Sequence, residues 1–102
     1  MAKNRNLGKQ VGDFVLWEND KVRVWDQVIM PGETVGPHDH DHDYFIVVLE
    51  NAKMTADMIN DKRSEVEFVA DNLIWVKSNG EVHTATNVDN KRWRNLIIEV
   101  KK

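Results

Sequence analysis

Three of the chain's four histidines alternate with aspartates in one short stretch. Residues 38–44 have the sequence HDHDHDY, and the fourth histidine is His83. If this stretch is extended, residues two apart share a face, so His38, His40, His42 and Tyr44 point the same way. Imidazoles at such spacing can chelate one ion, and neutral imidazole suits divalent transition metals. The sequence therefore predicts a site for Fe, Mn, Ni, Zn or Cu that needs a further ligand from elsewhere in the chain.

An alternating His-Asp run has a second interpretation, as a solvated loop that picks up metal ions without function. The neighbouring sequence favours a folded site instead. The run follows the turn dipeptide Pro31-Gly32 and leads directly into the apolar segment 44–49. The aspartates between the histidines are expected to face solvent, and the alternative is that they orient the imidazoles by accepting hydrogen bonds.

Composition limits the classes of protein to which this chain can belong. With 102 residues, 41% of them apolar and 30% charged, it has the size and balance of one globular domain. We expect a single domain over 1–102, with 1–12 as an N-terminal extension. The absence of cysteine excludes disulfides, thiolate metal sites and a cysteine nucleophile.

Charge and hydropathy argue against nucleic-acid and membrane partners. The net charge is −3, and the lysines and arginines are scattered along the chain rather than clustered. Residues 1–10 lack the apolar core of a signal peptide, and no apolar run approaches the roughly 18 residues of a membrane span. We therefore expect a cytoplasmic protein that binds neither nucleic acid nor membrane.

The elements that must position the histidines are strands. No window of about a dozen residues repeats apolar positions with helical spacing, whereas alternation of apolar and polar residues is frequent. Polar turns are predicted at Pro31-Gly32 and over 60–64. About eight strands in an all-β sandwich or barrel are expected. The clearest strand segments are 22–30, 44–49, 52–59, 65–68, 73–77 and 92–100.

Large side chains on these strands are candidates for the core and for the wall of a pocket. Met54 and Met58 are interpreted either as core residues or as the floor of a small apolar pocket. Gln27 is a candidate polar residue of the pocket, whereas Arg23 and Arg94 are expected to face outward. Three tryptophans on predicted strands are expected to fill the core: Trp25, Trp75 and Trp93.

Two spaced patterns resemble the two motifs of the cupin superfamily, over roughly residues 17–100. The Gly, His, His, Glu and Gly positions of the first motif are occupied by Gly32, His38, His40, Tyr44 and Asn51. The Gly, Pro, Gly, His and Asn positions of the second motif are occupied by Asn72, Ser78, Gly80, His83 and Asn87. The resemblance implies a single-domain cupin, whose double-stranded β-helix is a jelly-roll-type barrel.

Three departures from the cupin motifs affect the turns and the metal site. Asn51 and Asn72 replace glycines, and they are expected to keep the turns because asparagine tolerates positive φ better than other non-glycine residues. Ser78 in place of proline reduces turn rigidity. Tyr44 replaces the Glu that is a metal ligand in many cupins, which puts the usual set of three histidines and one glutamate in doubt.

Three ligand sets are therefore open. The favoured set, His38, His40 and His83, is similar to that of thiol and diketone dioxygenases in the same superfamily and leaves coordination positions open. In the second set, His42 is a fourth nitrogen ligand. In the third, Tyr44 binds as a phenolate, which its ordinary pKa near 10 disfavours. In the favoured set, Tyr44 is the candidate catalytic residue, because its hydroxyl lies beside the metal and can hydrogen-bond a substrate.

The resemblance implies an enzyme acting on a small molecule through its metal, and the all-histidine set favours a dioxygenase over an isomerase or lyase. The fold alone does not select among these chemistries. The alternative is a non-catalytic cupin module that binds or senses a small ligand or the metal itself. The resemblance also implies a homodimer that pairs through edge strands.

Overall fold

All regular elements of the described chain are β-strands. The computed structural model describes residues 4–5, 12–38, 42–58, 63–77 and 83–101. Within these ranges, no helix is long and apolar enough to cross a membrane. The strands are β1 (Asn4–Arg5), β2 (Phe14–Glu18), β3 (Val22–Ile29), β4 (Thr34–His38), β5 (Asp43–Val48), β6 (Ala52–Met58), β7 (Arg63–Phe68), β8 (Asn72–Val76), β9 (His83–Asn87) and β10 (Trp93–Val100).

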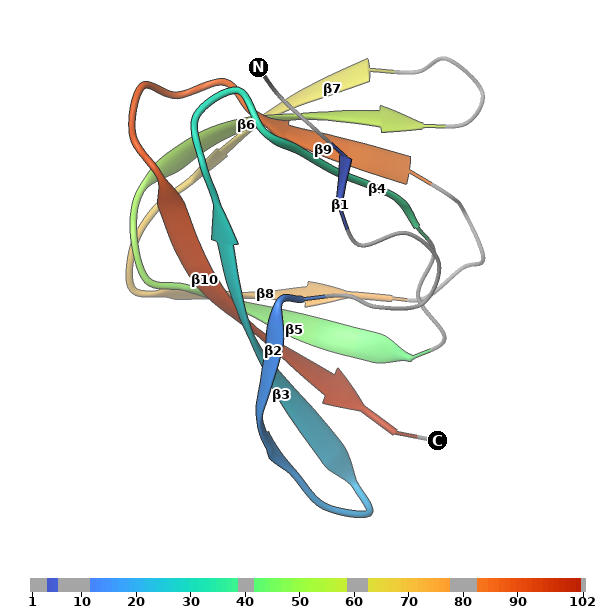
Figure 1. Cartoon of the computed structure of the whole chain (residues 1–102). Coiled ribbons are helices and arrows are strands. Elements are labelled where there is room, and N and C mark those ends of the chain that lie inside the picture. Colours follow the sequence, from blue (N-terminus) through green and yellow to red (C-terminus); the bar gives the residue numbers. More distant parts are fainter. Residues whose placement is uncertain (1–3, 6–11, 39–41, 59–62, 78–82, 102) are drawn as a thin grey trace.

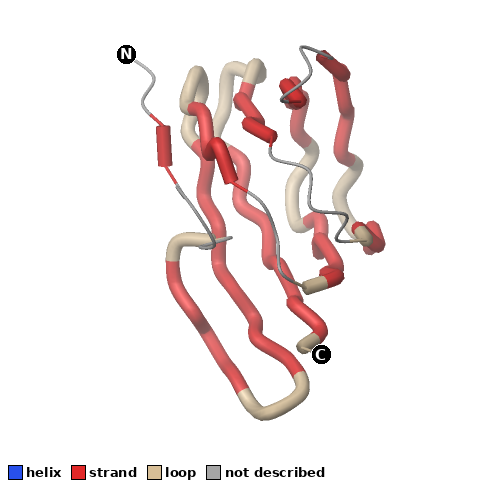
Figure 2. The backbone as a smooth tube through the Cα atoms, turned by 90° about the vertical axis from the view of Figure 1, so that its right-hand side faces the viewer, coloured by secondary structure: helices blue, strands red, loops and turns tan. Residues whose placement is uncertain are grey.

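The strands form two five-stranded sheets that face one another (Figures 1 and 2). One sheet has the order β1-β4-β9-β6-β7, and the other has the order β2-β3-β10-β5-β8. All pairs are antiparallel except β1 with β4, which brings Asn4 and Arg5 of the predicted N-terminal extension into the first sheet. The all-β sandwich or barrel expected from the alternation is confirmed.

Strands β3 and β10 show how alternation sets the inner face of the second sheet. Every second residue of β10 is buried from Trp93 to Glu99, and β3 alternates in the same way. Because the two strands pair without a break in register, their buried positions lie side by side. The inward pairs include Trp93 with Ile29, Asn95 with Gln27, and Ile97 with Trp25.

The core between the sheets confirms two of the three tryptophan predictions. Trp25 and Trp93 are buried, and Trp93 stacks on Phe68 of the opposite sheet with 4.5 Å between ring centroids. Trp75 was predicted in the core, but it is 49% exposed. It lies on the outer face of β8, where its ring meets that of Phe45 edge-on at 4.7 Å. The tryptophan therefore shields the outer face of the sheet instead of filling the core.

The turn predicted at Pro31-Gly32 connects β3 to β4. Gly32 has φ 78°, and the Glu33 amide donates to the Met30 carbonyl at 2.9 Å. Proline fixes a negative φ before the positive φ of Gly32, which defines a type II turn. The Gly32 amide also donates to the Asn87 carbonyl at 2.8 Å, so the turn is joined to the end of β9.

The two asparagines at glycine positions of the motifs do not act as expected. Asp71, rather than Asn72 or Asn51, has positive φ, at 68°. Asn51 stabilises the turn with its side chain, because its Oδ1 accepts the Ala70 amide at 2.8 Å. Asn72 donates from Nδ2 to the Val69 carbonyl at 3.0 Å. Side-chain hydrogen bonds, and not left-handed backbone, explain asparagine at these two positions.

Candidate metal centre and ligand cavity

Strands β4 and β9 bring His38 and His83 into register. Val35 pairs with Ala85, the register then shifts, and His38 pairs with His83. Without this shift, Pro37 would stand opposite His83. The irregularity contains Gly36 and Pro37, which are residue types that suit a β-bulge because proline cannot donate to the ladder. Two histidines far apart in the sequence are thereby placed opposite one another.

Strand alternation indicates which face of β9 carries position 83. Ala85 lines the space between the sheets, and Asn87 is fully buried. On a regular strand, residues two apart share a face, so alternation predicts the same face for position 83. The bulge puts position 38 opposite it across the β4–β9 pair. The backbone register therefore brings the positions of two predicted ligands, His38 and His83, opposite one another, and the ligand set itself stays a prediction.

The remaining candidate histidine ligands are His40 and His42. His40 lies outside the described residues. His42 is half-buried, and its Nδ1 is buried without a hydrogen-bond partner. Such an atom is uncommon in a folded protein, and a metal ion or ligand would satisfy it. Over the described ranges, no group of three or more ligating side chains comes together. The side chains of His38, His40 and His83 lie outside that description, so the three ligand sets stay predictions.

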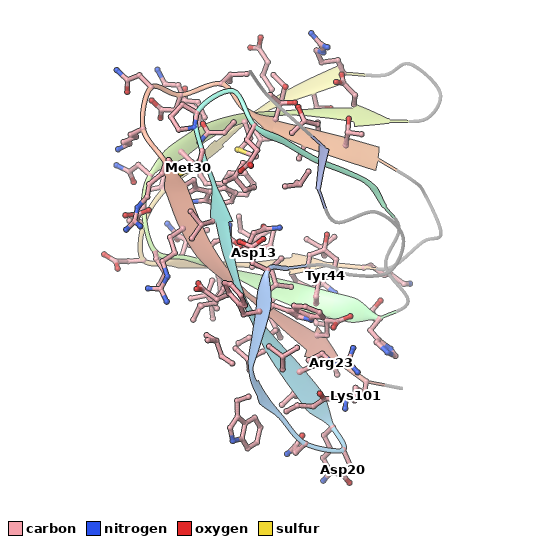
Figure 3. The ribbon with its side chains drawn as sticks, viewed as in Figure 1. Asp13, Asp20, Arg23, Met30, Tyr44 and Lys101 are labelled. Atoms are coloured by element: carbon pink, nitrogen blue, oxygen red, sulfur yellow. The ribbon has the colours of Figure 1, made fainter. Side chains whose placement is uncertain are left out.

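Tyr44 lies on the inner side of β5, close to the start of that strand (Figure 3). It is 5% exposed and packs with Trp25 and Ile97. Burial raises the pKa of Tyr44 to about 12. The hydroxyl therefore keeps its proton near neutral pH, where it can donate a hydrogen bond, and phenolate ligation is further disfavoured.

A cavity of about 140 Å³ lies between the two sheets. Met54 lines this cavity and also belongs to the buried core, so both interpretations of that residue hold, whereas the side chain of Met58 lies outside the described part of the chain. Four of the lining residues are polar, and none of them carries a formal charge. The lining residues are Gln27, Ile29, Val35, Tyr44, Ile46, Met54, Thr55, Ala56, Val66, Phe68, Ala85, Trp93, Asn95 and Ile97.

Asn95 is the polar residue of the cavity that sequence reasoning missed. It is 1% exposed, and both its Nδ2 and its Oδ1 are buried without a hydrogen-bond partner. Its register partner is Gln27, which is also buried and lines the cavity, as predicted. The sequence signal was weak: alternation groups Asn95 with Trp93 and Ile97 but does not show that this face is the inner one.

Glu99 carries a buried carboxylate that contacts Trp25 and Arg23. The Trp25 indole Nε1 donates to Glu99 Oε1 at 2.6 Å, and the Arg23 guanidinium is 3.6 Å from the same oxygen. Arg23 was expected to face outward, but it shares the strand face of buried Trp25, although it does not line the cavity. Arg94 faces outward as predicted, where it binds Asp26 at 2.9 Å.

This chain is similar to known proteins in structure, but no similar sequence was found. No protein-family model matches the sequence, and no curated protein is significantly similar to it. A cupin domain from Bordetella pertussis superposes with a TM-score of 0.80 over 87% of this chain and 91% of that chain, at 20% identity.

Two further solved structures agree. A cupin superfamily protein from Desulfitobacterium hafniense has a TM-score of 0.65, with 16% identity, 87% of this chain and 75% of that chain. An RmlC-like cupin with a double-stranded β-helix from Methanocaldococcus jannaschii has a TM-score of 0.67, with 14% identity, 84% of this chain and 75% of that chain. At these identities the likeness concerns the fold. The chain has the cupin fold, a double-stranded β-helix, as the two histidine motifs predicted.

Proposed function

We propose that this protein binds a divalent transition metal through His38, His40 and His83 and acts on a small molecule held in the cavity beside it. The observation that supports the proposal is the register of β4 and β9, in which a bulge sets His38 opposite His83. Tyr44 lies on the inner face of the opposite sheet and lines the cavity. A metal held by the histidines would therefore adjoin a space suited to a small ligand.

The donor chemistry fits such an ion. Imidazole nitrogens suit Fe, Mn, Ni, Zn and Cu, and three of them leave coordination positions open. His42 remains the alternative fourth ligand, because its Nδ1 is buried without a partner. When bound, the ion supplies Lewis-acid chemistry or activates dioxygen.

The chain's own residues bind and orient the substrate. The Tyr44 hydroxyl stays protonated and donates a hydrogen bond to a substrate oxygen. The apolar walls, such as Ile46 and Ile97, exclude water from the bound molecule. Together with an all-histidine ligand set, this favours a dioxygenase-like reaction over an isomerase or lyase reaction.

A non-catalytic binding or sensing module is the second candidate, and one observation favours it. The described lining of the cavity contains no acid, base or histidine apart from the phenol of Tyr44. General acid–base catalysis needs a group whose pKa lies near the working pH, and a phenol with a pKa of about 12 does not meet that need.

Oxygen uptake distinguishes the two functions. Tag-free, iron-loaded protein is offered small thiols, diketones and keto acids, with the His83→Ala variant as the metal-site control. The enzyme proposal predicts uptake with at least one class and its loss in the variant. Ligand binding without uptake across the panel supports the binding module, and uptake that survives in His83→Ala contradicts the proposed site.

A further inference from the structure

We propose that the cavity binds an uncharged primary carboxamide and that Asn95 recognises its amide group. This inference rests on the proposed function, because it names the ligand class of the same cavity. The observation behind it is the side chain of Asn95. Asn95 is 1% exposed, and neither its Nδ2 nor its Oδ1 has a hydrogen-bond partner.

A buried amide without partners is exceptional, since nearly all buried polar atoms in folded proteins are hydrogen-bonded. In the free protein, the two unpaired atoms of Asn95 reduce the folding free energy. A ligand that supplies the missing donor and acceptor restores it. Leucine or valine at position 95 would avoid this cost. A binding role explains why an amide stands there instead.

The pattern of donor and acceptor selects the ligand. Asn95 offers N–H donors and a carbonyl acceptor side by side. A primary carboxamide offers the complementary pair, because its carbonyl accepts from Nδ2 while its N–H donates to Oδ1. A carboxylate has no donor for Oδ1, and an alcohol can satisfy only one of the two atoms at a time in such a side-by-side arrangement.

The described residues of the cavity lining carry no charge, which supports a neutral ligand. Gln27, Tyr44, Thr55 and Asn95 are the polar lining residues of the described chain, and none can neutralise an anion or a cation. Burying a charge without a partner is far more costly than burying an amide. A carboxylate is therefore excluded from the Asn95 end of the cavity.

The size of the cavity limits the part of the ligand that it encloses. Its volume of about 140 Å³ is close to that of an engineered cavity of about 150 Å³ that holds benzene. The enclosed part therefore has about six non-hydrogen atoms, as in butyramide. The apolar walls, including Ile29, Val35 and Ile46, contact the hydrocarbon portion.

Asn95 and Tyr44 lie at different depths along the second sheet. Asn95 is opposite Val48 of β5, four residues beyond Tyr44 on that strand. At about 3.3 Å per residue, the two levels are roughly 13 Å apart along the strand. The carboxamide is therefore recognised away from Tyr44, and its other end extends toward the level of Tyr44.

The test is a titration of metal-free, tag-free protein with butyramide, followed by the side-chain amide resonances of Asn95 in nitrogen-15 NMR spectra. We expect a saturable shift of these resonances, with butyrate and butan-1-ol binding at least about tenfold more weakly. Asn95→Leu is expected to weaken butyramide binding at least about tenfold and to raise Tm, because it removes the two unpaired atoms. Asn90→Leu makes the same exchange at an exposed position and should leave binding unchanged.

Three results would overturn the inference: no saturable shift, so that only water satisfies Asn95; equal binding of butyrate; or undiminished butyramide binding by Asn95→Leu. If Asn95→Leu does not fold, Asn95→Asp replaces it, since the aspartate keeps the size but loses the N–H donors. The titration uses no metal. A failure here therefore leaves the metal site standing, and a failure of the metal site leaves amide binding measurable.

Discussion

Asn87 is fully buried where β9 ends, and its side chain holds three backbone segments together. Its Nδ2 donates to the carbonyls of Ile29 at 2.8 Å and Lys91 at 2.9 Å, and its Oδ1 accepts the Asp89 amide at 2.9 Å. This residue occupies the last position of the second cupin motif. Its contacts assign it the structural task of joining β3 to the loop before β10.

Replacing Asn87 with alanine leaves two carbonyls and one amide without their partners. We expect Asn87→Ala to lower the free energy of unfolding by about 3 kcal/mol, since each unsatisfied buried group costs about 1–3 kcal/mol. Urea unfolding measures the change. Asn90→Ala, at an exposed position of the same loop, is the control and should have little effect. A change in Asn87→Ala as small as in this control would contradict the assigned role.

Two polar residues of the cavity, Gln27 and Asn95, show what could be predicted from the sequence. Gln27 was named as a candidate polar residue of the pocket, and it lies on the buried face of β3 and lines the cavity. Asn95 was missed because β10 has apolar residues on both faces, so its pattern does not distinguish the inner face. Only the register with β3 decides that Asn95 faces inward. Its lack of a partner depends on the whole surrounding structure, which no local pattern contains.

At the scale of elements, an ion pair connects β6 to β7. Asp57 and Arg63 are register partners, and the Arg63 guanidinium donates to both carboxylate oxygens, at 2.6 and 3.2 Å. These hydrogen bonds from Arg63 hold the pKa of Asp57 below its ordinary value, and the side chains of Arg63 and Asp57 are 67% and 37% exposed. The pair therefore fixes the geometry of the hairpin more than it adds to stability.

The pH dependence of this hairpin follows from the sign of the shift. The folded state holds the Asp57 pKa below the unfolded value of 3.8, so the stabilising contribution is present above pH 3.8 and is lost as the pH falls through the folded pKa. NMR titration of the carboxyl group should give a midpoint below 3.8 that rises in Arg63→Gln. An unchanged midpoint in that variant would show that the ion pair does not form in solution.

Two glycines are required by their elements for different physical reasons. Gly32 has φ 78° in the β3–β4 turn, and a Cβ there would meet nothing within 4 Å. At Gly12, a Cβ would lie 2.6 Å from the Trp25 Cβ. The first position therefore needs backbone freedom, whereas the second needs space.

Substitution by asparagine distinguishes the need for backbone freedom at position 32 from the need for space at position 12. Alanine at either position is expected to destabilise the protein by about 1–2 kcal/mol. Asn at position 32 should recover most of the loss because asparagine tolerates positive φ, whereas Gly12→Asn should recover none. Thermal unfolding of the four variants measures this. Equal recovery at both positions would refute the assignment.

Elements were predictable where alternation is regular and less so elsewhere. Strands β3, β5, β6, β8 and β10 follow the predicted segments closely. The pattern did not indicate β4, because Gly36 and Pro37 interrupt it and are poor strand formers. The bulge that these two residues occupy requires a partner strand. The register of His38 with His83 therefore became visible only in the folded chain.

At the scale of the whole molecule, β2 is an edge strand with apolar residues on both faces. Phe14, Val15, Leu16 and Trp17 are 69%, 45%, 52% and 56% exposed. The strand pairs with β3 on one side and ends the order of its sheet. A free edge can pair antiparallel with the same edge of a second copy around a two-fold axis. This gives the expected homodimer a physical basis.

We expect the protein to sediment as a dimer and Trp17→Lys to sediment as a monomer. A charge on the edge opposes pairing with a second strand, and the loss of an exposed indole removes apolar contact area. Trp75→Lys, on the edge strand β8, is the control and should remain dimeric. A monomeric wild type, or a monomeric Trp75→Lys beside a dimeric Trp17→Lys, would contradict pairing through β2.

Titration of tag-free, metal-free protein with Co²⁺ tests whether the chain holds a metal ion through His38, His40 and His83. The account predicts one ion per chain, binding at least about a hundredfold weaker in His83→Ala, and a smaller loss in His42→Ala. Undiminished binding by His83→Ala would contradict the account, because the ion would then be held by the histidine run alone and not by paired strands.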